Sequence, residues 1–195
     1  MKSFPNLKCR YKKYAILGNH DYGDKERAGD NWKSEEDKKE KERQLKALYN
    51  DWGVQLLLNE SDTLTYNNHL IAVVGLKVYD PHHGFFDSDL DTAIFNVKGI
   101  ENKILLIHNP DFWNKEVVGK YDIKLTLAGH THGAQIGIGF GDYKISPAQL
   151  MFSQWRGLYE KVNENLIVNT GIGTYGLPFR VGMNPEIIVV MLQLM

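Results

Sequence analysis

The chain has 195 residues, with 43% hydrophobic residues, 24% charged residues and a formal net charge of −1 at pH 7. This balance is typical of a soluble globular protein and excludes the strongly positive field that draws proteins to nucleic acid or anionic membranes. The single cysteine, Cys9, excludes an internal disulfide and a cysteine-based metal site. We expect one domain over residues 1–195, with a sizeable buried core.

A helix is predicted in the most charged part of the sequence. Ser34 followed by Asp37 resembles the capping box that begins many helices, and Gly53 is well placed to end one. The mixed acidic and basic residues at 35–43 indicate a solvated helix face and not a nucleic-acid surface. Apolar residues recur at helical spacing between these ends, at Leu45, Leu48, Tyr49 and Trp52.

Strands and short helices are predicted over the remaining sequence, with a β-rich second half. One helix is expected from Ser88 to Val97, and another begins at Pro110, whose fixed φ suits the first helical position. A hairpin turn is expected at residues 67–68. The combination of predicted helices and strands indicates an α/β fold. Apolar runs predict strands at residues 14–17, 54–58, 63–66, 70–79, 103–107, 123–128, 136–138, 166–168 and 187–194.

Histidines follow three of these predicted strands. Gly18-Asn19-His20-Asp21 follows the first strand, His108-Asn109-Pro110 follows the strand at 103–107, and Gly129-His130-Thr131-His132-Gly133 follows the strand at 123–128. In an extended segment, residues two apart project to the same side, so His130 and His132 are expected to face one pocket. Imidazoles joined by the amide oxygen of Asn19 favour manganese, iron or zinc over calcium. The sequence therefore predicts a metal site at a sheet edge.

These motifs resemble those of the calcineurin-like metallophosphoesterases, and most closely the bacterial branch of membrane-associated lipid-headgroup phosphodiesterases. The resemblance extends over almost the whole chain and implies a four-layer α/β/β/α sandwich of two mixed sheets with helices outside. Its N-terminal portion is expected to be missing. The matching stretches are residues 15–23, 106–113, 127–133 and 168–180.

The resemblance also implies a two-metal hydrolase in which a metal-bound hydroxide attacks phosphorus. It places Asn19, His108 and His130 at one metal, and His132 at the other. The metals implied are two divalent ions, manganese, iron or zinc. The substrate implied is a phosphodiester or pyrophosphate with a lipid or nucleotide-like group.

Three further residues have roles that the resemblance or simple chemistry implies. His20 would act as general acid toward the leaving group. Asp21 would orient His20, or alternatively cap the turn. Arg180 is the best candidate for a phosphate contact outside the metals, with a surface ion pair as the alternative. The loop with His82 and His83 is a weaker candidate for substrate contact.

One departure from the family pattern limits the expected activity. The family begins with an Asp-x-His pair and a Gly-Asp motif that supply further metal ligands, but residues 1–17 contain neither aspartate nor histidine. At most one well-formed metal site is therefore expected, with a weak or inactive chain. The chain is read either as part of a longer protein or as a degenerate relative that serves as a metal-binding or interaction module. A third reading is one half of a split enzyme completed by an N-terminal fragment.

We expect no transmembrane segment, because no apolar run approaches the roughly 18 residues that a membrane helix needs. The opening residues also lack the apolar core of a signal peptide. The sequence as written therefore predicts a cytoplasmic protein. A longer native form that is peripheral to the membrane or anchored in it is the alternative.

Overall fold

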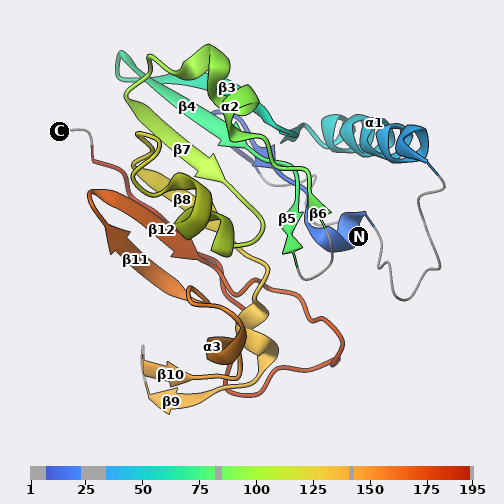
Figure 1. The fold of residues 1–195 in the computed structure, drawn as a ribbon, viewed down its shortest axis with the longest axis vertical. Helices are drawn as coiled ribbons and strands as arrows, with labels where there is room; N and C mark the ends of the chain where they lie inside the picture. Colours follow the sequence, from blue (N-terminus) through green and yellow to red (C-terminus); the bar gives the residue numbers. More distant parts are fainter. Residues whose placement is uncertain (1–7, 23–33, 82–84, 141–142, 194–195) are drawn as a thin grey trace.

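A computed structural model describes residues 8–22, 34–81, 85–140 and 143–193. In these residues, one six-stranded mixed sheet dominates, accompanied by three two-stranded sheets (Figure 1). The predicted α/β class is confirmed. The large sheet has the order β11-β12-β8-β7-β4-β3. Its strands are β3 (Glu60–Tyr66), β4 (His69–Gly75), β7 (Asn102–Leu106), β8 (Leu125–Ala128), β11 (Gly157–Lys161) and β12 (Glu164–Val168).

The four central strands of this sheet, β12, β8, β7 and β4, are parallel to one another, whereas the edge strands β11 and β3 are antiparallel. Parallel strands end at the same edge of a sheet, so the segments after β4, β7, β8 and β12 start side by side. The hairpin between β3 and β4 turns at Asn67 and Asn68, which adopt left-handed φ values of 47° and 66°. The turn predicted at these residues is confirmed.

One face of the large sheet is covered by short helices. These are α2 (Leu90–Ile94), the 3-10 turn η3 (Phe95–Val97) and the π-helical turn η4 (Trp113–Val117). Trp113 is fully buried in a cluster with Ala72 and Val74 of β4 and Leu105 of β7. The helix predicted from Ser88 is shorter than expected, because its N-cap is Asp89, whose side chain accepts from the Thr92 amide at 3.0 Å.

The opposite face of β4 is met by a small parallel pair, β1 (Tyr14–Ala15) with β2 (Gln55–Leu56). Side chains alternate along a strand, so Gly75 lies on the face opposite Ala72 and Val74. A Cβ at Gly75 would lie 2.4 Å from the Cβ of Leu57 and 2.9 Å from Cγ2 of Ile16. The absent side chain is therefore what lets the β1–β2 layer approach the large sheet.

Replacing Gly75 by alanine is expected to destabilise the fold, because the new methyl group overlaps a buried side chain close to its backbone. Overpacking of this kind costs about 1–3 kcal/mol. Urea denaturation followed by circular dichroism should show a lower midpoint for Gly75→Ala. Gly99→Ala is the matched control, because a Cβ there meets no atom within 4 Å. Equal midpoints for the two variants would contradict the prediction.

Helix α1 (Glu35–Asp51) begins and ends as predicted. The Ser34 hydroxyl accepts from the Asp37 amide at 3.2 Å, and Gly53 follows the helix with φ 64°. The prediction of a fully solvated charged face is wrong at Glu42, which is buried. Its carboxylate accepts from the Tyr22 hydroxyl at 3.0 Å and pairs with Lys77 at 2.8 Å. These two partners offset the cost of burying the charge.

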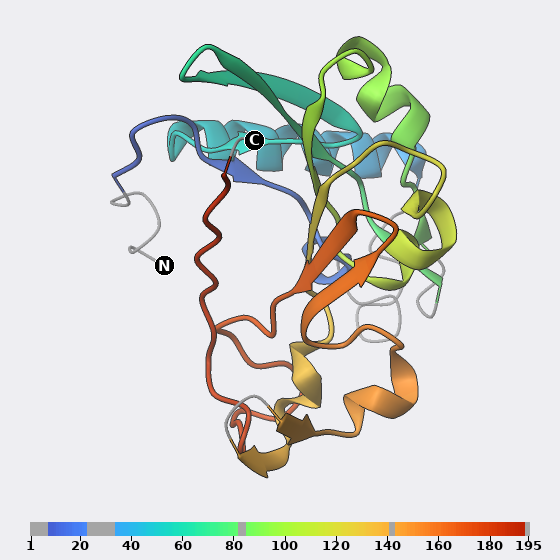
Figure 2. The same cartoon turned by 90° about the vertical axis from the view of Figure 1, so that its left-hand side faces the viewer.

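A smaller lobe lies at the opposite end of the molecule from α1 (Figures 1 and 2). It contains the hairpin of β9 (Ile138–Phe140) and β10 (Tyr143–Ile145), followed by α3 (Ala148–Met151). Its own small core consists of Ala148, Phe152, Trp155 and Met183. A further pair, β5 (Tyr79–Asp80) with β6 (Phe85–Phe86), follows β4.

The strand predicted at residues 187–194 is wrong over its described part. Residues 187–193 are assigned no strand and follow the surface as an extended segment, dark red in Figure 2. The exposed fractions of Ile187 and Met191 are 82% and 89%. An apolar run forms a strand only where a neighbouring strand supplies hydrogen bonds, and among the described residues no strand pairs with this segment. Across those residues, no helix combines the length and apolar character needed to cross a membrane.

Candidate metal centre

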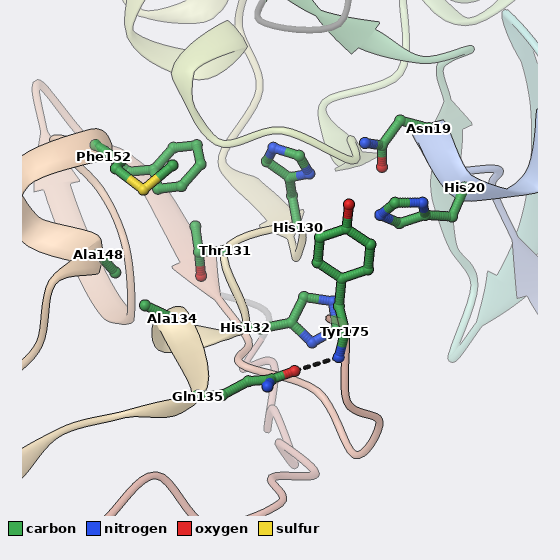
Figure 3. Close-up of a pocket in the computed structure, with 11 residues that line it drawn as sticks. Asn19, His20, His130, Thr131, His132, Ala134, Gln135, Ala148, Phe152 and Tyr175 are labelled. Atoms are coloured by element: carbon green, nitrogen blue, oxygen red, sulfur yellow. Dashed lines mark hydrogen bonds between the residues drawn. The ribbon is translucent and has the colours of Figure 1, made fainter. Parts of the chain in front are cut away.

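Three polar side chains from separate parts of the chain meet at the carboxyl edge of the sheet. Asn19 follows β1, His108 follows β7 and His130 follows β8. The Nε2 atom of His108 lies 2.8 Å from Oδ1 of Asn19 and 2.9 Å from Nδ1 of His130. Figure 3 shows Asn19 and His130 directed toward the same space. The structure thus brings together the residues that the sequence assigned to one metal.

The spacing of these donor atoms fits a single divalent ion. Ligands bind such ions at about 2.0–2.2 Å, so two neighbouring ligands around one ion are roughly 3 Å apart. The donor set is two imidazole nitrogens and one amide oxygen, which suits manganese, iron or zinc. A cluster of three or more His, Cys, Asp or Glu side chains able to hold a metal is absent from the described ranges. The third donor is instead the amide of Asn19.

Asp80 is a member of the site that the sequence analysis missed. Its buried carboxylate lies behind His130, with Oδ2 3.7 Å from Nε2 of the imidazole. This distance is longer than a hydrogen bond and is that of an ion pair with a protonated imidazole, while Nδ1 of His130 faces His108. The sequence did contain an indication of this residue, since Asp80 follows a predicted apolar strand as the three histidine motifs do.

His82 and His83, the weaker candidates for substrate contact, lie outside the described residues.

The turn η1 (Asn19–Asp21) is packed tightly under His108. A Cβ at Gly18 would lie 2.5 Å from Cε1 of the His108 ring, so the imidazole occupies the space that any other residue would fill. The Asp21 carboxylate accepts from the Gly18 amide at 2.8 Å. This contact is the capping alternative for Asp21, and its orientation of His20 stays a prediction.

His132 lines the same pocket as His130, but the backbone between them is not extended as predicted. His130 and His132 have left-handed φ values of 68° and 50°, and the 3-10 turn η5 (His132–Gln135) continues with φ 59° at Gly133. A tight turn, and not an extended strand, therefore brings His130 and His132 to the same pocket. Residues other than glycine rarely adopt this backbone region. Backbone strain of this kind is concentrated at functional sites.

His132 and Arg180 form a second group beside the first. The Arg180 Nη2 atom lies 3.5 Å from Nδ1 of His132 and also donates to the carbonyls of Thr170 at 2.7 Å and Gly173 at 2.6 Å. Burial, followed by the positive charges of Arg180 and His20, lowers the pKa of His132. The imidazole is therefore neutral at pH 7, the form that binds metals. Its place at a second metal and the contact of Arg180 with phosphate stay predictions.

Tyr175 and Gln135 are also site residues that the sequence analysis missed. The Tyr175 ring lies over His20, with centroids 4.2 Å apart and planes at 35°. Gln135 is buried and holds the loop of Tyr175 in place. Its Oε1 accepts from the Tyr175 amide, and its Nε2 donates to the carbonyls of Leu177 at 3.0 Å and Phe179 at 3.2 Å. The only signal in the sequence was a glycine-rich run after an apolar strand.

These residues surround a pocket of about 210 Å³ (Figure 3). The imidazoles of His20, His130 and His132 occupy one part of its wall, and apolar side chains occupy the other. The complete lining is Asn19, His20, His130, Thr131, His132, Ala134, Gln135, Ala148, Met151, Phe152 and Tyr175.

Known proteins with similar sequences lie mostly in Bacillus subtilis (strain 168) and in vertebrates. The uncharacterized protein YpbG of B. subtilis is 30% identical over 78% of this chain and 53% of its own length. The uncharacterized metallophosphoesterase YkuE of the same organism is 28% identical over 96% of this chain and 58% of its own length. The chain thus spans a little over half the length of these two relatives.

A more distant relative is the transmembrane protein with metallophosphoesterase domain of Bos taurus, 27% identical over 96% of this chain and 40% of its own length. No solved structure matches the chain significantly. The family model described as calcineurin-like phosphoesterase matches residues 1–134, which is more than half of the chain and includes all four residues from Asn19 to His132 that were assigned to metals. The chain therefore belongs to the calcineurin-like phosphoesterase family, whose members are metal-dependent hydrolases of phosphoester bonds.

Proposed function

We propose that this chain carries the catalytic centre of a metal-dependent phosphoesterase that cleaves phosphodiester or pyrophosphate bonds. The observation that supports this most is the convergence of Asn19 and His130 on Nε2 of His108, at 2.8 and 2.9 Å. A divalent ion held there would polarise a phosphoryl oxygen and lower the pKa of a bound water. Manganese, iron and zinc are the proposed ions, and a lipid-linked or nucleotide-like phosphoester is the proposed substrate class.

The residues around this cluster are suited to binding a phosphoester and donating a proton. His20 lies on the exposed side of the pocket, where an imidazolium could donate to the leaving oxygen, and the ring of Tyr175 fixes its plane. The Asp21 carboxylate stabilises the turn that presents His20. Arg180 adds a positive charge beside His132, which favours an anionic substrate in the pocket.

We propose slow turnover for residues 1–195 alone. The described residues supply three donors to one ion but only His132 to a second, and in-line phosphoryl transfer is commonly promoted by two ions. The same observation favours a second candidate function, a metal-binding module without catalysis. Both functions require a divalent ion to bind, and only the first requires hydrolysis.

The test combines manganese binding with hydrolysis of bis(p-nitrophenyl) phosphate. Calorimetry of the wild-type chain should detect one manganese ion per molecule, and p-nitrophenol release should be slow but above the metal-only background. His20→Ala should lower this rate roughly hundredfold while leaving the manganese affinity unchanged, because His20 donates a proton and is not a ligand. Manganese binding without turnover would favour the module, and the absence of binding in titrations with manganese, iron and zinc would refute both functions.

A further inference from the structure

The pocket beside the metal ligands has an apolar half that the proposed chemistry does not use. Ala134, Ala148, Met151 and Phe152 form this part of the wall, three of them on or directly after α3. Figure 3 shows Phe152, Ala148 and Ala134 on the opposite side of the pocket from Asn19 and His20. Cleavage of the phosphoester itself requires only the polar half.

This apolar wall directly adjoins the candidate metal ligands. The Phe152 ring meets the His130 ring edge to face, with centroids 5.3 Å apart and planes at 86°. Phe152 and Ala148 are buried in the core of the small lobe, so the wall is a fixed surface. Met151 forms the rim and is 62% exposed. If a phosphorus atom lies beside His130, the group attached to it would therefore reach the carbon atoms of this wall within one or two bonds of the phosphorus.

The opposite wall of the pocket, which contains Tyr175, is also held in place by hydrogen bonds. Tyr175 is fixed through its backbone amide by the buried Gln135, and the guanidinium of Arg180 binds the carbonyls of Thr170 and Gly173 at the base of the same loop. These contacts keep one aromatic ring at the mouth of the pocket, and two of the groups that make them, Gln135 and Thr170, are buried. Preorganisation of this kind lowers the entropy cost of binding a ligand.

We infer that the apolar half of the pocket is a subsite for an uncharged apolar group on the substrate, either an aromatic ring or an alkyl chain, esterified to the scissile phosphate. This inference rests on the proposed function and narrows its substrate class. The whole pocket has a volume of about 210 Å³, which the apolar group would share with the phosphate; for comparison, an apolar cavity of about 150 Å³ holds a benzene molecule. A sugar or polyol would leave its hydroxyl groups without partners against Ala134, Ala148 and Phe152, at a cost in binding free energy.

The inference is tested with phosphonates that share one head group and differ in the attached group. Calorimetry with the manganese-loaded chain should show phenylphosphonate or butylphosphonate binding about tenfold more tightly than methylphosphonate. A preference for phenylphosphonate identifies an aromatic ring as the bound group, and a preference for butylphosphonate identifies an alkyl chain. Equal affinities for all three would overturn the inference.

Two matched variants on α3 locate the effect. Met151→Gln replaces a rim thioether by a neutral amide of similar size, and it should lower the preference over methylphosphonate while leaving methylphosphonate affinity unchanged. Leu150→Gln makes a similar change one residue earlier, at a side chain that is 91% exposed and does not line the pocket. It should leave all three affinities unchanged. The same loss of preference in both variants would overturn the inference.

A measurement without metal separates this inference from the proposed function. Saturation-transfer NMR of the metal-free chain with benzyl alcohol should show binding, weaker in Met151→Gln than in Leu150→Gln. If no phosphonate binds the manganese-loaded chain but benzyl alcohol still binds in this way, the proposed function fails and the apolar pocket stands as a binding site. If benzyl alcohol does not bind the wild-type chain, the subsite itself is refuted.

Discussion

His108→Ala is expected to abolish manganese binding, because His108 is the central member of the proposed ligand set. Its Nε2 atom is the one that approaches both Asn19 and His130, at 2.8 and 2.9 Å. Removing it leaves an amide and one imidazole, which compete poorly with water for a divalent ion. We expect the dissociation constant to rise at least roughly 100-fold, since even the loss of a supporting contact behind a ligand costs 10–100-fold. Calorimetry with manganese measures this directly.

His69→Ala is the matched control for this variant. His69 is an exposed histidine at the start of β4, and therefore at the edge of the sheet opposite the candidate site. Its replacement should leave manganese affinity unchanged. Wild-type affinity in His108→Ala would mean that the Asn19-His108-His130 cluster is a chain of hydrogen bonds and not a metal centre.

The second large effect is expected from Gly18, which has no side chain to bind a metal. Gly18→Ala would place a methyl group 2.5 Å from Cε1 and 2.7 Å from Nδ1 of His108, so the imidazole must leave its position. The ring is then displaced from Asn19 and His130, and manganese affinity should fall as far as in His108→Ala. The measurement is the same calorimetric titration, with circular dichroism to verify that the chain is folded.

Gly129→Ala is the informative comparison, because Gly129 is the first residue of the Gly-His-Thr-His-Gly motif. A Cβ at Gly129 would have only ordinary contact with the carbonyl oxygen of Asn169, 3.9 Å away. Its φ is not left-handed, so alanine can be accommodated there. We expect near-normal manganese binding by Gly129→Ala. Equal losses of manganese affinity in Gly18→Ala and Gly129→Ala would show that the loss does not come from a methyl group placed against His108.

The part of the site that the sequence predicted depends on local patterns. Apolar runs that end in Asn19, His108 or His130 indicate strand ends, and parallel strands bring their ends together. The assignment of these three residues to one metal was implied by the family resemblance. The α/β class was also predictable from local patterns, and so was the cap at Ser34, because capping depends on residues only three apart.

The remaining parts depend on contacts between distant segments, which a local pattern does not encode. Gln135 binds a loop 40 residues later in the chain, and Asp80 is 50 residues from His130, the histidine beside which it lies. The left-handed turn at His130 and His132 could not be predicted either, because only a few per cent of non-glycine residues adopt this backbone region. A strand was predicted at residues 187–194 because short apolar runs are typical of strands, but such a run does not encode the presence of a neighbouring strand.

The order in which the ligands occur along the chain also determines when they can meet during folding. Asn19 and His108 are 89 residues apart, whereas His108 and His130 are 22 apart. Closing the longer loop costs more chain entropy, and parallel strands with crossovers form slowly. Pairing of β7 with β8 would first unite the two histidines, and the arrival of the β1 segment would add the amide oxygen last. On this order of events, the metal would bind to a sheet that has already formed and would add to its stability.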